Sequence, residues 1–158
     1  MTASGIAVEL VVAPTDEVRI LVDELEAILA AEYPPEQRHG LPLTAIFQPH
    51  IRFFVARLNG VAAGCGGVAL FADFAEVKRM YVRETARGHG AASALLAAIE
   101  AATCEAGLSR LLLETCTGQH AALRFYQREG FKIRGPFGDY LAMPPKTIAA
   151  SIFVEKAV

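Results

Sequence analysis

The sequence lacks several features that would place a protein in a large functional class at once. No segment approaches the roughly 20 consecutive apolar residues that span a bilayer, so we expect no membrane association. No run of basic residues is longer than Lys78-Arg79 and the formal net charge is −2, which disfavours nucleic acid as a partner. Residues 1–10 have no basic start before their apolar run, so no signal peptide is predicted.

Cysteine is also scarce. Cys65, Cys104 and Cys116 are too far apart for a Cys-x-x-Cys clamp, and the histidines add no ligand spacing, so we expect no metal. The odd number of cysteines argues against a disulfide framework and favours a reducing, cytoplasmic location. Hydrophobic residues, in contrast, make up 53% of the chain and charged residues 20%. This balance predicts a single folded domain over residues 1–158.

The hydrophobic pattern predicts both strands and helices. Strand-like segments precede the first strand–helix–strand units, which favours an α/β fold of the α+β type with a mixed sheet flanked by helices. The expected strands cover 6–12, 51–57, 61–70, 74–82, 111–115, 131–134 and 151–155, and the expected helices cover 15–31, 91–106 and 119–129. We therefore expect six or seven strands, with an irregular or briefly helical segment over 34–49 and a loop over 135–146.

The most informative segment is the loop Arg87-Gly88-His89-Gly90-Ala91-Ala92, which joins a strand-like run to a helix-like run. Two glycines permit a tight turn, and the first N–H groups of the helix then point outward with the positive end of its dipole. Arg87 adds a formal charge beside them. The loop therefore predicts a site for a phosphate or pyrophosphate group.

Three other interpretations of this loop compete. A tight turn without a ligand needs only the two glycines. A Rossmann dinucleotide site needs a third glycine where Ser93 stands, although Glu114 would supply its acidic residue. That site also begins from a parallel strand, whereas residues 74–82 follow a hairpin-like meander. A Walker phosphate loop is excluded, because no Gly-Lys-Ser/Thr follows.

Two segments carry a family resemblance. Arg87-x-x-Gly90-x-Ala92 is similar to the Gln/Arg-x-x-Gly-x-Gly/Ala signature of the GNAT superfamily of N-acetyltransferases, and the match extends upstream through residues 76–82. Residues 122–131 resemble the second hallmark segment of that superfamily, so the specific likeness covers roughly residues 74–134. The resemblance implies acetyl-CoA as cosubstrate and a mainly antiparallel sheet that splays into a V beside the strand at 74–82.

The resemblance also implies which residues hold acetyl-CoA. The pyrophosphate would lie on the loop residues Arg87, Gly88, His89, Gly90, Ala91 and Ala92, with His89 contributing only its backbone. The pantetheine arm would pair with the main chain of Met80, Tyr81 and Val82. A bulge in that strand would free an N–H group for the thioester carbonyl. Gln119 stands where many relatives have Asn, and we expect it to contact the cofactor with a longer reach.

Acetyl transfer to an amine sets two proton-transfer tasks. A thiolate whose conjugate acid has a pKa of about 8.5 is helped by receiving a proton, and Tyr126 matches the family position for that donor. The alternative for Tyr126 is a packing role, because it shares an apolar helix face with Ala122 and Phe125. For the proton acceptor, the resemblance implies Glu76, while Glu114 at the end of the adjacent strand or a chain of waters are alternatives.

The acceptor is less well determined. In this family its specificity comes from segments that correspond here to 32–49 and 135–150. Arg38, His39 and Arg52 are consistent with a carboxylate on the acceptor, or simply with solvated cations, and we expect His39 and His50 to be surface residues. A small-molecule or amino-acid-like primary amine is the expected substrate. A protein amino group and a non-catalytic acyl-CoA-binding module are the alternatives. A homodimer through the strand at 151–155 is also expected.

Overall fold

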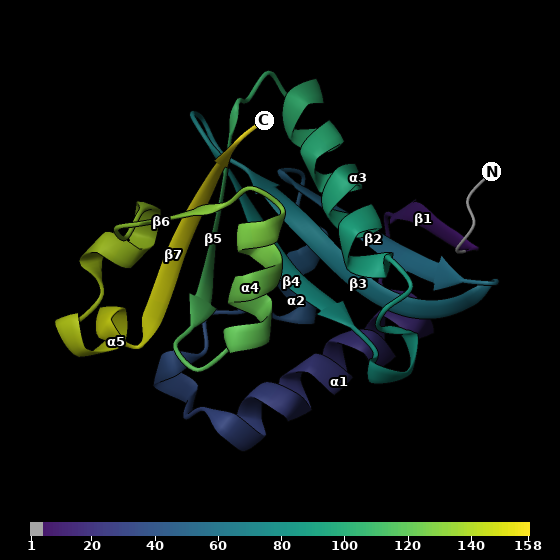
Figure 1. Ribbon diagram of the computed structural model, residues 1–158, viewed down its shortest axis with the longest axis horizontal. Helices are drawn as coiled ribbons and strands as arrows, with labels where there is room; N and C mark the ends of the chain where they lie inside the picture. The colour runs from purple at the N-terminus through teal and green to yellow at the C-terminus, as the bar shows by residue number, and fades with distance from the viewer. Residues whose placement is uncertain (1–4) are drawn as a thin grey trace.

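A computed structural model describes residues 5–158 of the chain (Figure 1). Within them, a seven-stranded sheet has the order β1-β2-β3-β4-β5-β7-β6. The strands are β1 (Ile6–Val11), β2 (Ile51–Leu58), β3 (Val61–Leu70), β4 (Ala75–Val82), β5 (Arg110–Cys116), β6 (Lys132–Arg134) and β7 (Ser151–Ala157). The helices are α1 (Asp16–Glu32), α2 (Leu43–Ile46), α3 (Ala91–Glu105), α4 (His120–Arg128) and α5 (Pro145–Ala149), with short 3-10 turns η1 (Pro35–Gln37), η2 (Glu84–Ala86) and η3 (Gly138–Ala142).

The sheet is mixed and mainly antiparallel. Strands β1 to β4 form an antiparallel meander, β4 and β5 are parallel, and β7 pairs antiparallel with both β5 and β6. This confirms the predicted α/β fold class with six or seven strands. The Rossmann interpretation is wrong, because β4 follows β3 as the next antiparallel strand of the meander and has a parallel partner only in β5.

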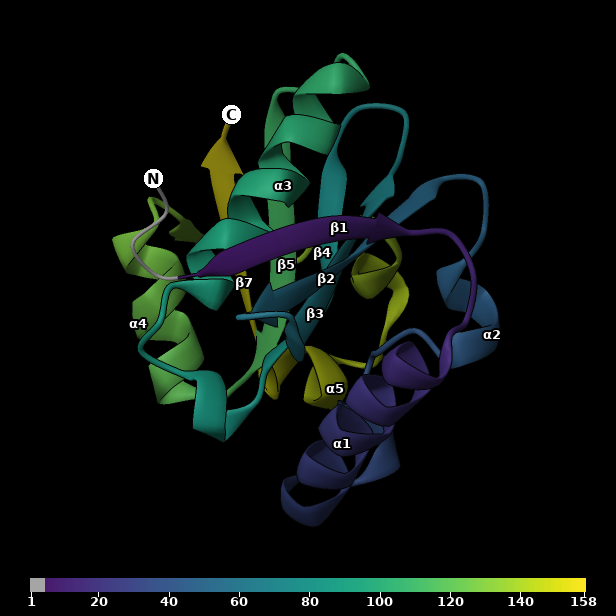
Figure 2. The same ribbon diagram turned by 90° about the vertical axis from the view of Figure 1, so that its right-hand side faces the viewer.

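Side chains that alternate along each strand divide the core between the two faces of the sheet. Leu111 and Leu113 pack with residues of α3 and α4 on one face. Leu112, between them, packs with Tyr140 of η3 on the other face. That second face also carries α1, whose Leu21 is fully buried in the cluster that contains Phe53 of β2. Figure 2 shows α4 and α1 on opposite sides of the sheet.

Helix α1 begins and ends where its sequence predicts. The Thr15 hydroxyl accepts a hydrogen bond from the Val18 N–H (3.3 Å), and Asp16 and Glu17 lie in the first turn at the positive end of the dipole. Pro34 and the following proline cannot continue the helix, which ends at Glu32. The segment that follows contacts this helix again, since Arg38 pairs with Glu26 of α1 (3.6 Å).

The structure differs from the sequence predictions in two places. The segment predicted as a loop over 135–146 contains η3 and the first residues of α5, whereas the segment predicted to be irregular or briefly helical contains η1 and α2 as expected. Strand β7 is not a free edge, since β5 lies on one side of it and residues 132–134 of β6 cover its middle on the other. The predicted homodimer through β7 therefore lacks the open strand on which it depended.

None of the helices described between residues 5 and 158 is long and apolar enough to cross a membrane.

Candidate active site

The glycine loop leads directly into α3. Gly88 and Gly90 have φ angles of 82° and 85°, which non-glycine residues rarely adopt, and a Cβ on either would meet no atom within 4 Å. The first bond within the helix runs from the Ala94 N–H to the Gly90 carbonyl (3.0 Å). The N–H groups of residues 91–93 are therefore left without a partner in the helix, as an anion site at a helix start requires.

Strand β4 contains a bulge opposite β3. Cys65 lies opposite Tyr81 whereas Gly67 lies opposite Lys78, so β4 has one residue more than β3 over this stretch. Arg79 within the bulge has a φ of 55°, in the left-handed region. Its buried side chain donates from Nε to the Leu41 carbonyl (2.8 Å) and forms an ion pair with Glu26. The bulge is therefore held from outside the sheet by an arginine that reaches α1 and the loop before α2.

The sheet opens between β4 and β5. The two strands pair only at Ala75 with Leu111 and at Glu76 with Leu112 among the described residues, and their arrowheads lie apart in Figure 1. This is the V-shaped split that the family resemblance implied. The main chain of residues 80–82 therefore faces an opening rather than a neighbouring strand on that side.

A groove follows this opening on the face covered by α3 and α4. Most residues predicted to hold the cofactor line it, namely Met80, Tyr81, Val82, Arg87, Gly88, Gly90, Ala91, Ala92 and Gln119. His89 is the exception, since it is exposed and does not contribute to the lining. Ser93, Phe125 and Arg128 also line the groove, so Arg128 adds a second cation to its wall.

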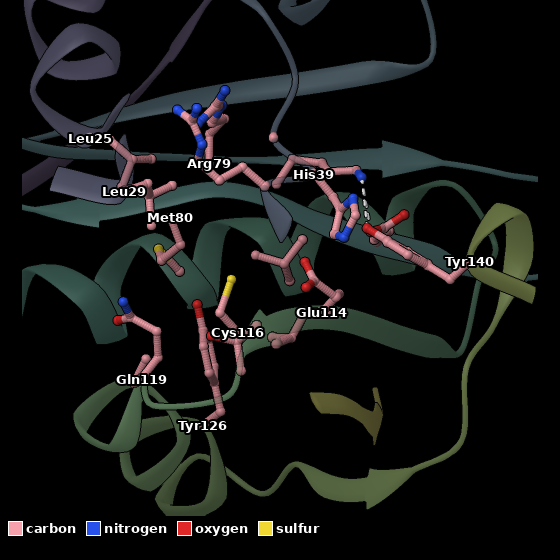
Figure 3. A pocket seen from close by; sticks show the side chains of 18 residues that line it. Leu25, Leu29, His39, Arg79, Met80, Glu114, Cys116, Gln119, Tyr126 and Tyr140 are labelled. Carbon is pink, nitrogen blue, oxygen red and sulfur yellow. Dashed lines mark hydrogen bonds and ion pairs between the residues drawn. The ribbon is translucent and has the colours of Figure 1, made fainter. Parts of the chain in front are cut away.

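A second cavity lies across the split, under α1 and η3 (Figure 3). Its polar lining includes Glu76, Glu114 and Tyr140. The cavity and the groove have six lining residues in common: Leu25, Leu29, Met80, Gln119, Ala122 and Tyr126. The two spaces therefore meet at the opening between β4 and β5.

Tyr126 lies at this junction. Its side chain is 7% exposed, and its ring packs edge-on against Phe125 and Phe131 at centroid distances of 5.3 and 5.5 Å. The hydroxyl points away from α4 toward Met80 in Figure 3 and makes no hydrogen bond within residues 5–158. Burial raises the pKa of Tyr126, so the phenol stays protonated at neutral pH. The ring serves packing while the hydroxyl remains available at the junction.

Glu76 is part of a network rather than a free carboxylate. It is 5% exposed, forms an ion pair with Lys78 (2.9 Å) and accepts a hydrogen bond from the Tyr140 hydroxyl (2.7 Å). The Lys78 ammonium also lies over the Tyr140 ring, 5.7 Å from its centroid. These contacts hold Glu76 on the cavity wall and balance its charge.

Glu114 is the carboxylate without a balancing cation. It accepts a hydrogen bond from the Ser151 hydroxyl (2.7 Å) and forms no ion pair within residues 5–158. Burial raises the pKa of Glu114; the Ser151 hydrogen bond and Lys78 oppose this rise, and Glu76 adds to it. Its side chain faces the cavity together with His39 and Tyr140 (Figure 3).

The prediction that His39 is a surface residue is wrong. It lines the cavity, and its ring meets Tyr140 edge-on at 5.7 Å between centroids. Burial and the nearby Lys78 ammonium lower the pKa of His39, so the ring is neutral at pH 7. No local pattern marks this residue, because its loop, 38–41, packs against Arg79, which is distant in the sequence.

Gln119 precedes α4 and joins it to the end of α1. Its Nε2 donates to the Glu32 carboxylate (3.2 Å) and to the Tyr33 hydroxyl (3.3 Å), and Tyr33 donates in turn to the Thr117 carbonyl (3.1 Å). This connection closes one side of the junction between groove and cavity. A cofactor contact from Gln119 remains a prediction.

Comparison with known proteins identifies the class of this site. The chain belongs to the acetyltransferase (GNAT) family, which matches residues 22–131. It is 43% identical over 143 residues to a protein named IAA acetyltransferase from Azospirillum brasilense, over 89% of this chain and 90% of that protein. The family membership and such relatives make the protein an acyltransferase.

Solved structures agree with this assignment. A Klebsiella pneumoniae protein classed as an acyl-CoA N-acyltransferase is similar with a TM-score of 0.74 and 30% identity, over 96% of this chain and 97% of that one. A GNAT acetyltransferase from Elizabethkingia anophelis with acetyl-CoA bound shares the fold with a TM-score of 0.69 and 18% identity, over 98% and 99% of the two chains. The resemblance drawn from the sequence is thereby confirmed.

Proposed function

We propose that the protein transfers an acetyl group from acetyl-CoA to the primary amine of a small molecule by direct attack. The observation that carries this proposal is the meeting of two spaces at the split between β4 and β5. One space has the donors and cations that suit a pyrophosphate, and the other has carboxylates that suit an amine. Tyr126 lies where the two would exchange an acyl group.

The groove has the features that acetyl-CoA would require. The N–H groups of residues 91–93 and the guanidinium groups of Arg87 and Arg128 would hold the pyrophosphate, and the open space at Gly88 and Gly90 lets it approach the backbone. The main chain of residues 80–82 would pair with the pantetheine amides. When bound, acetyl-CoA supplies an acetyl group activated as a thioester.

The bulge in β4 would contribute electrostatic stabilisation of the transition state. Because Arg79 turns the strand out of register, a main-chain N–H of residues 80–82 is available to donate to the thioester carbonyl oxygen. A donor fixed before the reaction stabilises the negative charge that develops there at no cost of reorganisation. The Arg79 side chain would act only as a positioning group, through Leu41 and Glu26.

Glu114 is better placed than Glu76 to receive the proton of the acceptor. A lysine-like ammonium has a pKa of about 10.4 and must lose its proton before it attacks. Glu76 is occupied by Lys78 and Tyr140, whereas Glu114 has no ionic partner in the described chain, and its raised pKa makes it a stronger base than an ordinary carboxylate. In this proposal Glu76 positions Lys78 and Tyr140, and its role as base remains the alternative.

Tyr126 would complete the reaction. The amine nitrogen forms a bond to the acetyl carbon and the carbon–sulfur bond breaks. The Tyr126 hydroxyl gives its proton to the departing thiolate, and the second proton that the nitrogen loses as it becomes an amide restores the phenol. An intermediate on Cys116 is disfavoured, because burial raises the pKa of this thiol to about 11 and keeps it protonated at neutral pH. Direct transfer between the two substrates is therefore the mechanism that the site supports.

A screen of amines tests this function. The protein is mixed with acetyl-CoA and a panel of small primary amines, released thiol is followed continuously, and the acetylated amine is identified by mass spectrometry. We expect turnover with at least one small amine. Binding of CoA without turnover of any amine would support the non-catalytic module, and acetylation restricted to protein amino groups would contradict a small-molecule acceptor.

A further inference from the structure

The charges that line the cavity are balanced in number only when Glu26, which pairs with two of the lining arginines, is included, and they are not balanced in place. Lys78 and Glu76 form a pair at 2.9 Å, and His39 is neutral, so these three residues leave no net charge. Glu114, when ionised, carries a negative charge without an ionic partner among residues 5–158. A compensating positive charge must therefore come from elsewhere on the wall or from the acceptor.

That positive charge is found on the loop between η1 and α2. Arg38 and Arg79 both line the cavity, and both pair with the single carboxylate of Glu26, Arg38 at 3.6 Å. Arg79 is further satisfied by the Leu41 carbonyl. Two guanidinium groups that share one carboxylate leave one positive charge in surplus.

Arg38 is the less satisfied of the two. Its side chain is 21% exposed, its guanidinium makes no hydrogen bond within residues 5–158, and its Nε lies buried without a partner. Arg57 and Arg83, in contrast, each donate to carboxylates at 2.5 to 3.0 Å. A guanidinium presents a planar set of donors that matches a carboxylate, and leaving these donors unused on the wall of a cavity is unfavourable.

We propose that the acceptor is a zwitterion, a small amino acid whose carboxylate binds Arg38 while its amine lies at Glu114. This inference rests on the proposed acetyl transfer and specifies its substrate class. The ammonium transfers one proton to the Glu114 carboxylate, and the freed nitrogen lone pair attacks the thioester. The apolar side chains of Leu25, Leu29 and Val77 line the same cavity and suit the aliphatic part of such a molecule.

Matched substrate pairs test this proposal. L-alanine and β-alanine are each compared with ethylamine, and γ-aminobutyrate with propylamine, with kcat/KM expressed per unprotonated amine. Because charge-assisted hydrogen bonds are the strong ones, we expect the wild-type protein to prefer at least one amino acid over its partner by roughly 10-fold or more. The preference should fall toward unity in Arg38→Gln and be partly restored in Arg38→Lys.

Arg52→Gln is the matched control, because Arg52 lies outside the cavity and donates to the Pro49 carbonyl (2.9 Å). It should keep the wild-type preference, and the melting temperature and CoA affinity of Arg38→Gln show whether that variant is folded. Equal or better turnover of the plain amines in every pair would overturn the zwitterion while leaving acetyl transfer intact. An unchanged preference in Arg38→Gln would also overturn it. No turnover of any amine would overturn the proposed function and this inference together.

Discussion

Arg79 lies in the middle of a strand and has a left-handed backbone. At this position the Gly variant should be more stable than the Ala variant, which is the reverse of their usual order of stability in a strand. Both variants lose the charged hydrogen bond to Leu41, about 1.5–3 kcal/mol, together with the ion pair to Glu26. Only Ala keeps a Cβ at a φ of 55°. Glycine within a strand is normally about 0.5–1 kcal/mol worse than Ala, but here Arg79→Gly should be about 1 kcal/mol more stable than Arg79→Ala.

Thermal unfolding measures this difference. For a chain of this length, 1 kcal/mol corresponds to roughly 2–4 °C in melting temperature. Arg110 in β5 gives a matched control, since it also pairs with a carboxylate, that of Glu155, but has no positive φ. At Arg110 the Ala variant should be the more stable. An Arg79→Ala variant as stable as Arg79→Gly would refute the assignment of a strained bulge held by this side chain.

Two further variants examine the groove and the cavity. Gly90→Val should abolish the increase in melting temperature caused by CoA, because its side chain fills the space beside the helix start. Gly107→Val is the control, since Gly107 has a similar φ of 78° at the far end of α3, and this variant should retain the increase. Equal increases in both variants would mean that the groove is misassigned. Burial raises the pKa of Glu114 above 4.5, so the folded state binds this proton more tightly and the charged group lowers stability as the pH rises past 4.5. Glu114→Gln should therefore melt higher than wild type at pH 8, with the difference shrinking toward pH 4, while acetyl transfer is lost; a lower melting temperature at pH 8 with full activity would contradict the role of Glu114.

Local sequence signals predicted the fold and most of the residues that line the groove. The meander and the glycine loop could be predicted from short segments, because the alternation of a strand, the residues of a turn and the start of a helix depend on neighbouring positions. Gly88 and Gly90 adopt the positive φ that their place in the loop requires. The position of β7 between β5 and β6 could not be predicted from the sequence, because the packing of the whole chain sets the order of strands in a sheet.

The lining of the cavity under α1 and η3 was predicted less completely, because it is built from contacts between distant residues. His39 enters it through the loop that Arg79 holds, and no periodicity marks that loop. The pairing of Glu76 with Lys78 and Tyr140 depends on η3, which lies in a segment predicted as irregular. The preference for Glu114 over Glu76 as base therefore needed the structure, although both residues were candidates from the sequence.

The central claim, that an acyl group is exchanged where the groove meets the cavity, is tested most directly at Tyr126. Tyr126→Phe keeps the ring that packs against Phe125 and Phe131 and removes only the hydroxyl that points toward Met80. With one amine acceptor and saturating acetyl-CoA across pH 6 to 10, the turnover number should fall by about 10²- to 10⁴-fold, while the melting temperature and the affinity for acetyl-CoA change little. Turnover equal to wild type across this range would contradict the account and leave Tyr126 as a packing residue.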